Sequence, residues 1–132
     1  MTYADFTNLA QSQDSRNNFQ PCNADLSFLP VPLRLFYTTH DPVDVEIVLH
    51  DSTSVRFCPM KYLKQIQKEY AIEDSSFIFA TQEGDPIYYK PDGIFKSAHG
   101  ASDTNETKIS DNFDSYIEML LKEMLDKAEV KP

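Results

Sequence analysis

The chain has 132 residues, of which 41% are hydrophobic, and a formal net charge of −9 at pH 7. This length matches one domain, and nine phenylalanines and seven tyrosines are enough to build its core. The excess of acid argues against direct nucleic-acid binding, because contacts with phosphates need clustered Lys and Arg, and no apolar run approaches the roughly 20 residues of a membrane-spanning helix.

Two features bear on the compartment. Cys22 and Cys58 are the only cysteines, and residues 1–6 lack the basic start and the apolar stretch of an export signal. We therefore expect a cytoplasmic protein whose two thiols pack in the interior instead of forming a disulfide.

Two helices joined by a loop are expected first. Thr2 is a suitable N-cap for a short helix over residues 2–10, and residues 11–24 are polar and rich in turn formers, with Phe19 as an anchor. The prolines within residues 29–32 suit the first turn of a second helix, where no amide partner is needed. The residues expected to face inward from the two helices are Tyr3, Phe6, Leu9, Ala10, Leu33, Phe36 and Tyr37.

Two strands and a third helix follow. Asp41-Pro42 favours a turn, after which alternating apolar residues predict a strand over 43–49, with residues 54–58 as its partner. Pro59 opens the helix. Its buried stripe is expected to be Tyr62, Leu63, Ile66 and Tyr70. Its three lysines, expected on a solvated face and not in a phosphate site, are Lys61, Lys64 and Lys68.

The three glycines, at positions 84, 93 and 100, fall in one window and indicate tight turns. Gly84 follows the apolar run 77–81, and Gly93 separates residues 87–90 from residues 94–98. Glycine supplies the positive φ that short hairpin turns require. We therefore expect a β-meander in the second half of the chain.

A long amphipathic helix is expected last. Residues 101–108 are polar, and Ser110 is the expected N-cap. The apolar residues that recur at intervals of three and four are Phe113, Tyr116, Ile117, Leu120, Leu121, Met124 and Leu125. The elements together predict a single α+β domain over residues 1–132, with a mostly antiparallel sheet of about five strands and helices packed on one face.

The order and spacing of several short stretches carry a family resemblance. These stretches are Leu29-Pro30 leading into Leu33-Arg-Leu-Phe-Tyr37, Phe79-Ala80 before Gly84-Asp85-Pro86-Ile87, Gly93-Ile94-Phe95 leading to His99-Gly100, and Ile109-Ser110 followed by Asn112-Phe113. Over approximately residues 26–125, the chain resembles the SUKH superfamily. That superfamily groups fungal regulators of cell-wall glucan synthesis with bacterial immunity proteins against polymorphic toxins.

The resemblance implies a non-enzymatic protein-binding domain. In the bacterial version, an acidic surface would cover the basic face of a toxin such as a nuclease, through charge complementarity. The acids expected to bind this partner lie at the hairpin tips and in the loop that follows: Glu83, Asp85, Asp92, Asp103 and Glu106. No nucleophile motif, phosphate loop or cofactor motif accompanies them, so neither catalysis nor a cofactor is expected.

Two other functions stay open. The first is a regulatory scaffold in cell-wall signalling, as in the fungal members. The second is a small hydrolase or metal-dependent enzyme that uses the neighbourhood of His50, or of His99 with Glu83 and Asp85. The densest set of potential metal ligands is His40, Asp41, Asp44, Glu46, His50 and Asp51. A half-exposed strand shows the same pattern, so no metal is expected.

Overall fold

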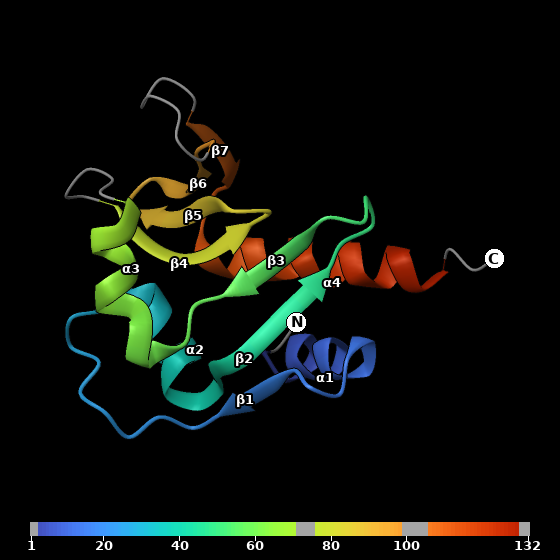
Figure 1. The fold of residues 1–132 in the computed structure, drawn as a ribbon, viewed down its shortest axis with the longest axis horizontal. Helices are drawn as coiled ribbons and strands as arrows, with labels where there is room; N and C mark the ends of the chain where they lie inside the picture. The colour runs from blue at the N-terminus through green and yellow to red at the C-terminus, as the bar shows by residue number, and fades with distance from the viewer. Residues whose placement is uncertain (1–2, 71–75, 99–105, 130–132) are drawn as a thin grey trace.

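The structure, a computed structural model, describes residues 3–70, 76–98 and 106–129. Within them, seven antiparallel strands form one open sheet in which each strand pairs with its neighbours in sequence (Figure 1). The strands are β1 (Asn18–Gln20), β2 (Asp41–Val48), β3 (Ser54–Phe57), β4 (Phe77–Gln82), β5 (Asp85–Lys90), β6 (Gly93–Lys96) and β7 (Thr107–Ser110). The helices are α1 (Tyr3–Gln13), α2 (Val31–His40), α3 (Leu63–Tyr70) and α4 (Phe113–Glu129). The predicted α+β class with an antiparallel sheet is confirmed.

The main core lies between one face of the sheet and helices α1, α2 and α4 (Figure 1). Phe36 of α2 lies at its centre, with aromatic neighbours at ring-centroid distances between 5.2 and 6.5 Å. These neighbours are Tyr3, Phe6, Phe19, Tyr37, Phe57 and Phe113. Aromatic pairs at such distances add about 0.5–1.5 kcal/mol each beyond their buried area. The predicted inward faces of the first two helices are confirmed, and Phe19 anchors its segment as expected.

A second, smaller cluster lies on the opposite face of the sheet. Its buried residues are Ile78, Tyr88 and Phe95, which pair across β4, β5 and β6. Ile66 and Tyr70 of α3 pack against this cluster. The prediction that the helices cover one face is therefore wrong for α3. The central strands carry apolar side chains on both faces, so both faces need a cover.

The sheet has seven strands instead of five, because two short strands lie in polar stretches. β1 falls inside the expected loop over 11–24, and β7 begins within the polar stretch 101–108. The turn predicted at Asp41-Pro42 is also wrong, since Asp41 starts β2 and pairs with Gln20. Pairing with β1 thus overrides the local turn preference of the Asp-Pro sequence.

Three predictions about the later helices also need correction. Ser110 belongs to β7, and the N-cap of α4 is Asn112, whose Oδ1 accepts a hydrogen bond from the Ser115 amide at 2.8 Å. Tyr62 is 50% exposed, because it ends a 3-10 turn before α3. Leu125 is 47% exposed on α4. Thr2, the predicted N-cap of the first helix, lies outside the described residues.

The meander of β4, β5 and β6 is confirmed. Glu83 and Gly84 form its first turn with φ of 50° and 89°. Gly93 begins β6 at φ 154°, and a Cβ there would lie 2.7 Å from the carbonyl oxygen of Ser110. The close approach of β7 therefore requires glycine at this position. In the ranges that the structure covers, no helix has both the length and the apolar character needed to cross a membrane.

Candidate functional site

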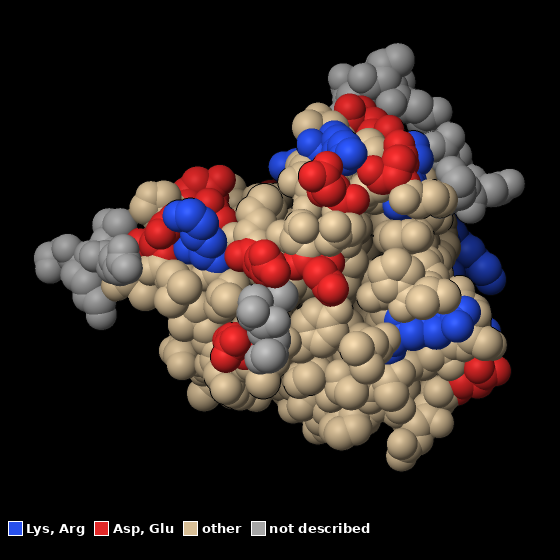
Figure 2. Space-filling view, turned by 180° about the vertical axis from the view of Figure 1, so that it is seen from behind, with Lys and Arg blue, Asp and Glu red and all other residues tan. Residues whose placement is uncertain are grey.

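The hairpin acids predicted to bind a partner do not form one cluster. Glu83 lies in the turn between β4 and β5 and Asp85 directly follows it, whereas Asp92 lies in the turn at the other end of β5. A strand of six residues separates the two turns by about 20 Å. Asp103 lies outside the described residues. Figure 2 shows carboxylates with Lys and Arg side chains among them over the upper part of this face, above a broad area with few charges.

Glu106 is held within the protein. Its Oε1 accepts a hydrogen bond from the Tyr88 hydroxyl at 2.5 Å, and Lys90 Nζ lies 3.2 Å from its Oε2. The Lys90 ammonium also lies 4.9 Å from the centroid of the Phe95 ring. Burial, together with the bond to Glu106, raises the pKa of Tyr88 to about 12. This network favours a structural role for Glu106, which fastens the start of β7 to the face that α3 covers.

The potential metal ligands near β2 are divided between its two ends. The His40 ring stacks on Phe36, and burial lowers its pKa. Asp41 accepts a hydrogen bond from the Met60 amide at 2.9 Å. His50 is exposed beyond the other end of the strand, and His99 is not among the described residues. Across residues 3–70, 76–98 and 106–129, no three His, Cys, Asp or Glu side chains gather as a metal site.

Three neighbouring hollows that share lining residues lie near the β2 edge of the sheet and beside α3. We call them together the β2 groove. The central hollow, of about 90 Å³, is lined by Asp14, Arg16, Asn17, Asp44, Glu46 and Arg56. It shares Asp14, Arg16 and Glu46 with a hollow of about 420 Å³ between α1, β2 and α4. It shares Arg56 with a third hollow of about 330 Å³ beside α3, the α3 hollow.

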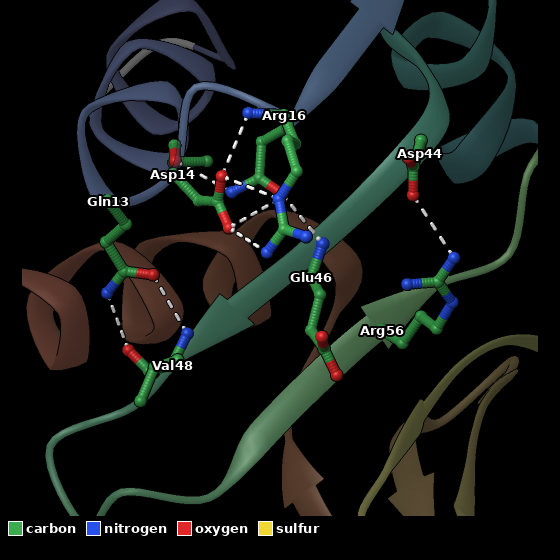
Figure 3. Close-up of polar contacts among 9 residues, drawn as sticks. Gln13, Asp14, Arg16, Asp44, Glu46, Val48 and Arg56 are labelled. Carbon is green, nitrogen blue, oxygen red and sulfur yellow. Dashed lines mark hydrogen bonds and ion pairs between the residues drawn. The ribbon is translucent and has the colours of Figure 1, made fainter.

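Three carboxylates and two guanidinium groups line the central hollow (Figure 3). Arg16 binds Asp14 at 2.7 Å, and its hydrogen bonds hold the pKa of Asp14 at about 2. Arg56 binds Asp44 at 3.2 Å. The carboxylate of Glu46 extends away from Arg16 and makes no ion pair in the part of the chain that the structure describes (Figure 3). The hollow therefore has a formal charge of −1 and one carboxylate that is available to a partner.

Two side-chain amides close the edge of β2 beside this hollow. Gln13 pairs with the backbone of Val48, since its Nε2 donates to the carbonyl at 2.7 Å and its Oε1 accepts from the amide at 2.8 Å (Figure 3). Asn17 Oδ1 accepts a hydrogen bond from the Glu46 amide at 2.9 Å. These contacts continue the ladder beyond β1, which pairs with β2 only as far as Asp44. Because this edge is satisfied, the groove presents side chains instead of free backbone groups.

The cysteines and lysines contribute differently to the surface. Cys22 and Cys58 are free thiols that contact the main core, and burial raises the pKa of Cys58 to about 12.

Lys61 and Lys64 are exposed, but their ammonium groups lie 5.1 Å and 4.9 Å from the ring centroids of Tyr62 and Phe28. Lys61 and Lys64 therefore lie against aromatic rings.

Part of the β2 groove is visible in the sequence. The alternation over 43–49 places Asp44 and Glu46 on the outward face, as the structure has them. Arg16 gives no such signal, because long-range contacts bring its segment to that strand: the pairing of β1 with β2 and the hydrogen bonds of Gln13 and Asn17. No family model, curated protein or solved structure matches this chain.

Proposed function

We propose that this chain is a single, non-enzymatic protein-binding domain that covers a basic surface of another protein. The sequence resemblance to SUKH immunity proteins suggests a toxin as the partner, bound in the cytoplasm. The regulatory scaffold of the fungal members is the second form of the same binding function. The immunity form needs an acidic surface, and neither form needs bond-making chemistry.

The observation that carries the proposal is the β2 groove. Its central hollow has an excess of carboxylates, and Glu46 is exposed there without an ion pair among the described residues. Arg16 and Arg56 already form ion pairs with Asp14 and Asp44 in this hollow. Its carboxylates therefore bind guanidinium groups of the same chain. A basic partner offers the same groups and would extend this pattern to Glu46.

The wider surface supports the same function. Glu69, Glu83 and Asp92 are exposed and make no ion pair within the described ranges. With a formal net charge of −9, such a surface attracts a basic protein over a distance and speeds their association. We keep four of the hairpin and loop acids as outer contacts of the partner: Glu83, Asp85, Asp92 and Asp103. Glu106 contributes indirectly, because it holds β7 in position.

A capture experiment tests the proposal. The tagged full chain is mixed with the purified product of the neighbouring gene, and the affinity of the complex is then measured by calorimetry. Glu46→Gln should weaken binding by about tenfold, since it removes one charge-assisted contact. Glu118→Gln is the matched control, because Glu118 is exposed on α4 and lines none of the three hollows. Absence of a complex, or equal losses in the two variants, would contradict the proposed site.

A further inference from the structure

We propose that the α3 hollow receives one arginine side chain of the partner protein. The inference rests on the proposed function and names the chemistry that this part of the β2 groove recognises. The hollow measures about 330 Å³, at the lower end of the range for ligand pockets. This volume suits one long side chain.

The walls of the hollow match the two parts of an arginine side chain. Ile66 of α3 is half-buried and offers an apolar surface for the methylene groups. Tyr62 lies beside it with 50% of its surface exposed, which is unusual for a large aromatic side chain. A guanidinium group stacks well on such a ring. The ammonium of Lys61 lies 5.1 Å from the centroid of this ring, so the ring already contacts one cation of its own chain.

Glu69 supplies the negative charge. Its Oε1 accepts a hydrogen bond from Gln65 Nε2 at 3.0 Å, which fixes the carboxylate one helical turn from Gln65. No cation pairs with Glu69 in the described parts of the chain, so its charge is available. Glu69 lines the hollow together with Cys58, and its charge adds to the rise that burial chiefly causes in the pKa of the Cys58 thiol.

Arg56 also lines the hollow, but its positive charge is already matched. Its guanidinium lies 3.2 Å from Asp44, on the side of the central hollow (Figure 3). Both side chains of this pair are more than half exposed, at 58% and 60%. The unmatched charge of the α3 hollow is therefore that of Glu69. Arginine fits better than lysine, because a planar guanidinium can stack on Tyr62 and donate two hydrogen bonds to one carboxylate.

The test uses the full ¹⁵N-labelled chain and a small probe, so it does not depend on the partner. N-acetyl-arginine amide is titrated to millimolar concentrations, with N-acetyl-citrulline amide as the neutral control. The inference predicts saturable shifts of the amides of Tyr62, Gln65 and Glu69 with the arginine probe and much smaller shifts with citrulline. Glu69→Gln should weaken the arginine probe by about fivefold or more. Glu118→Gln should leave it unchanged, and dispersed spectra check that both variants fold.

Equal shifts with both probes, shifts confined to another surface, or unchanged binding in Glu69→Gln would each overturn the inference. The neighbouring gene product separates this inference from the proposed function. If it binds and Glu69→Gln leaves its affinity unchanged, the arginine pocket is wrong and the binding function stands. If the probe binds at α3 and no complex forms with that protein, the pocket stands and the proposed partner is wrong.

Discussion

Gln67 connects α3 to the sheet, and its replacement by methionine should destabilise the protein strongly. Its side-chain amide donates to the carbonyl oxygens of Ile78 and Leu63 at 2.7 and 2.8 Å, and it accepts from the Ile78 amide at 2.8 Å. Ile78 is 1% exposed, so water cannot replace these partners without local opening. Methionine keeps the length of the side chain and its apolar contacts, while the backbone amide and carbonyl of Ile78 lose their partner.

Each buried backbone group left without a partner costs about 1–3 kcal/mol, so Gln67→Met should lower the free energy of unfolding by about 2–4 kcal/mol. Urea denaturation followed by far-ultraviolet circular dichroism measures this change, since the chain has no tryptophan. Gln65→Met on the same helix is the matched control, because Gln65 is exposed and its side chain bonds, among the described residues, only to Glu69. Its effect should stay within about 0.5 kcal/mol. Equal stabilities of the two variants would refute the assigned role of Gln67.

Three further predictions concern the core, one turn and the response to alkali. Phe36→Ala should destabilise by about 3–5 kcal/mol in urea denaturation, since it empties the centre of the aromatic cluster; a loss below about 1 kcal/mol would contradict that central position. Gly93→Ala should lower the thermal midpoint, because its Cβ would lie 2.7 Å from the Ser110 carbonyl oxygen. Gly84→Ala should lower the midpoint less, because the space around Gly84 is open and only its positive φ is strained for alanine. Stability should be fully present below pH about 9, and it should fall as the pH rises toward 12, because the folded state raises the pKa values of Cys58 and Tyr88 to about 12. Urea midpoints measured between pH 7 and about 11.5 check this sign, and constant midpoints would contradict it.

The parts of the fold that sequence reasoning reached are those with strong local signals. Gly84 and Gly93 mark the meander because few other residues accept their backbone angles. The apolar repeat of α4 likewise identifies a helix, and five of its residues are buried as predicted: Phe113, Tyr116, Ile117, Leu120 and Met124. Such signals depend on a few neighbouring residues, so one sequence is enough to interpret them.

The features that sequence reasoning missed depend on distant pairing. β1 has three residues and one core side chain, Phe19, so no periodic pattern can reveal it. The pairing of Phe19 with Pro42 extends a segment whose own sequence favours a turn. The stripe of α3 was visible through Ile66 and Tyr70, but the face of the sheet that it covers was not.

The candidate site likewise has one part that local sequence patterns indicate and another that depends on distant contacts. Asp44 and Glu46 alternate outward along β2, so their exposure could be predicted from the sequence. The groove itself requires Gln13, Asp14 and Arg16 to lie beside that strand, about 30 residues away in sequence, and this depends on how α1 packs. Turn positions indicate only that the hairpin acids are exposed, and exposure does not bring Glu83 and Asp92 together across the length of β5.

The most direct test of recognition through charge is the affinity for the neighbouring gene product as a function of ionic strength. Raising sodium chloride from about 50 to about 500 mM shortens the screening length several-fold. We predict that affinity falls by at least about tenfold, mainly through slower association, and that Glu46→Gln reduces this salt dependence. An affinity that is the same at both salt concentrations would contradict it.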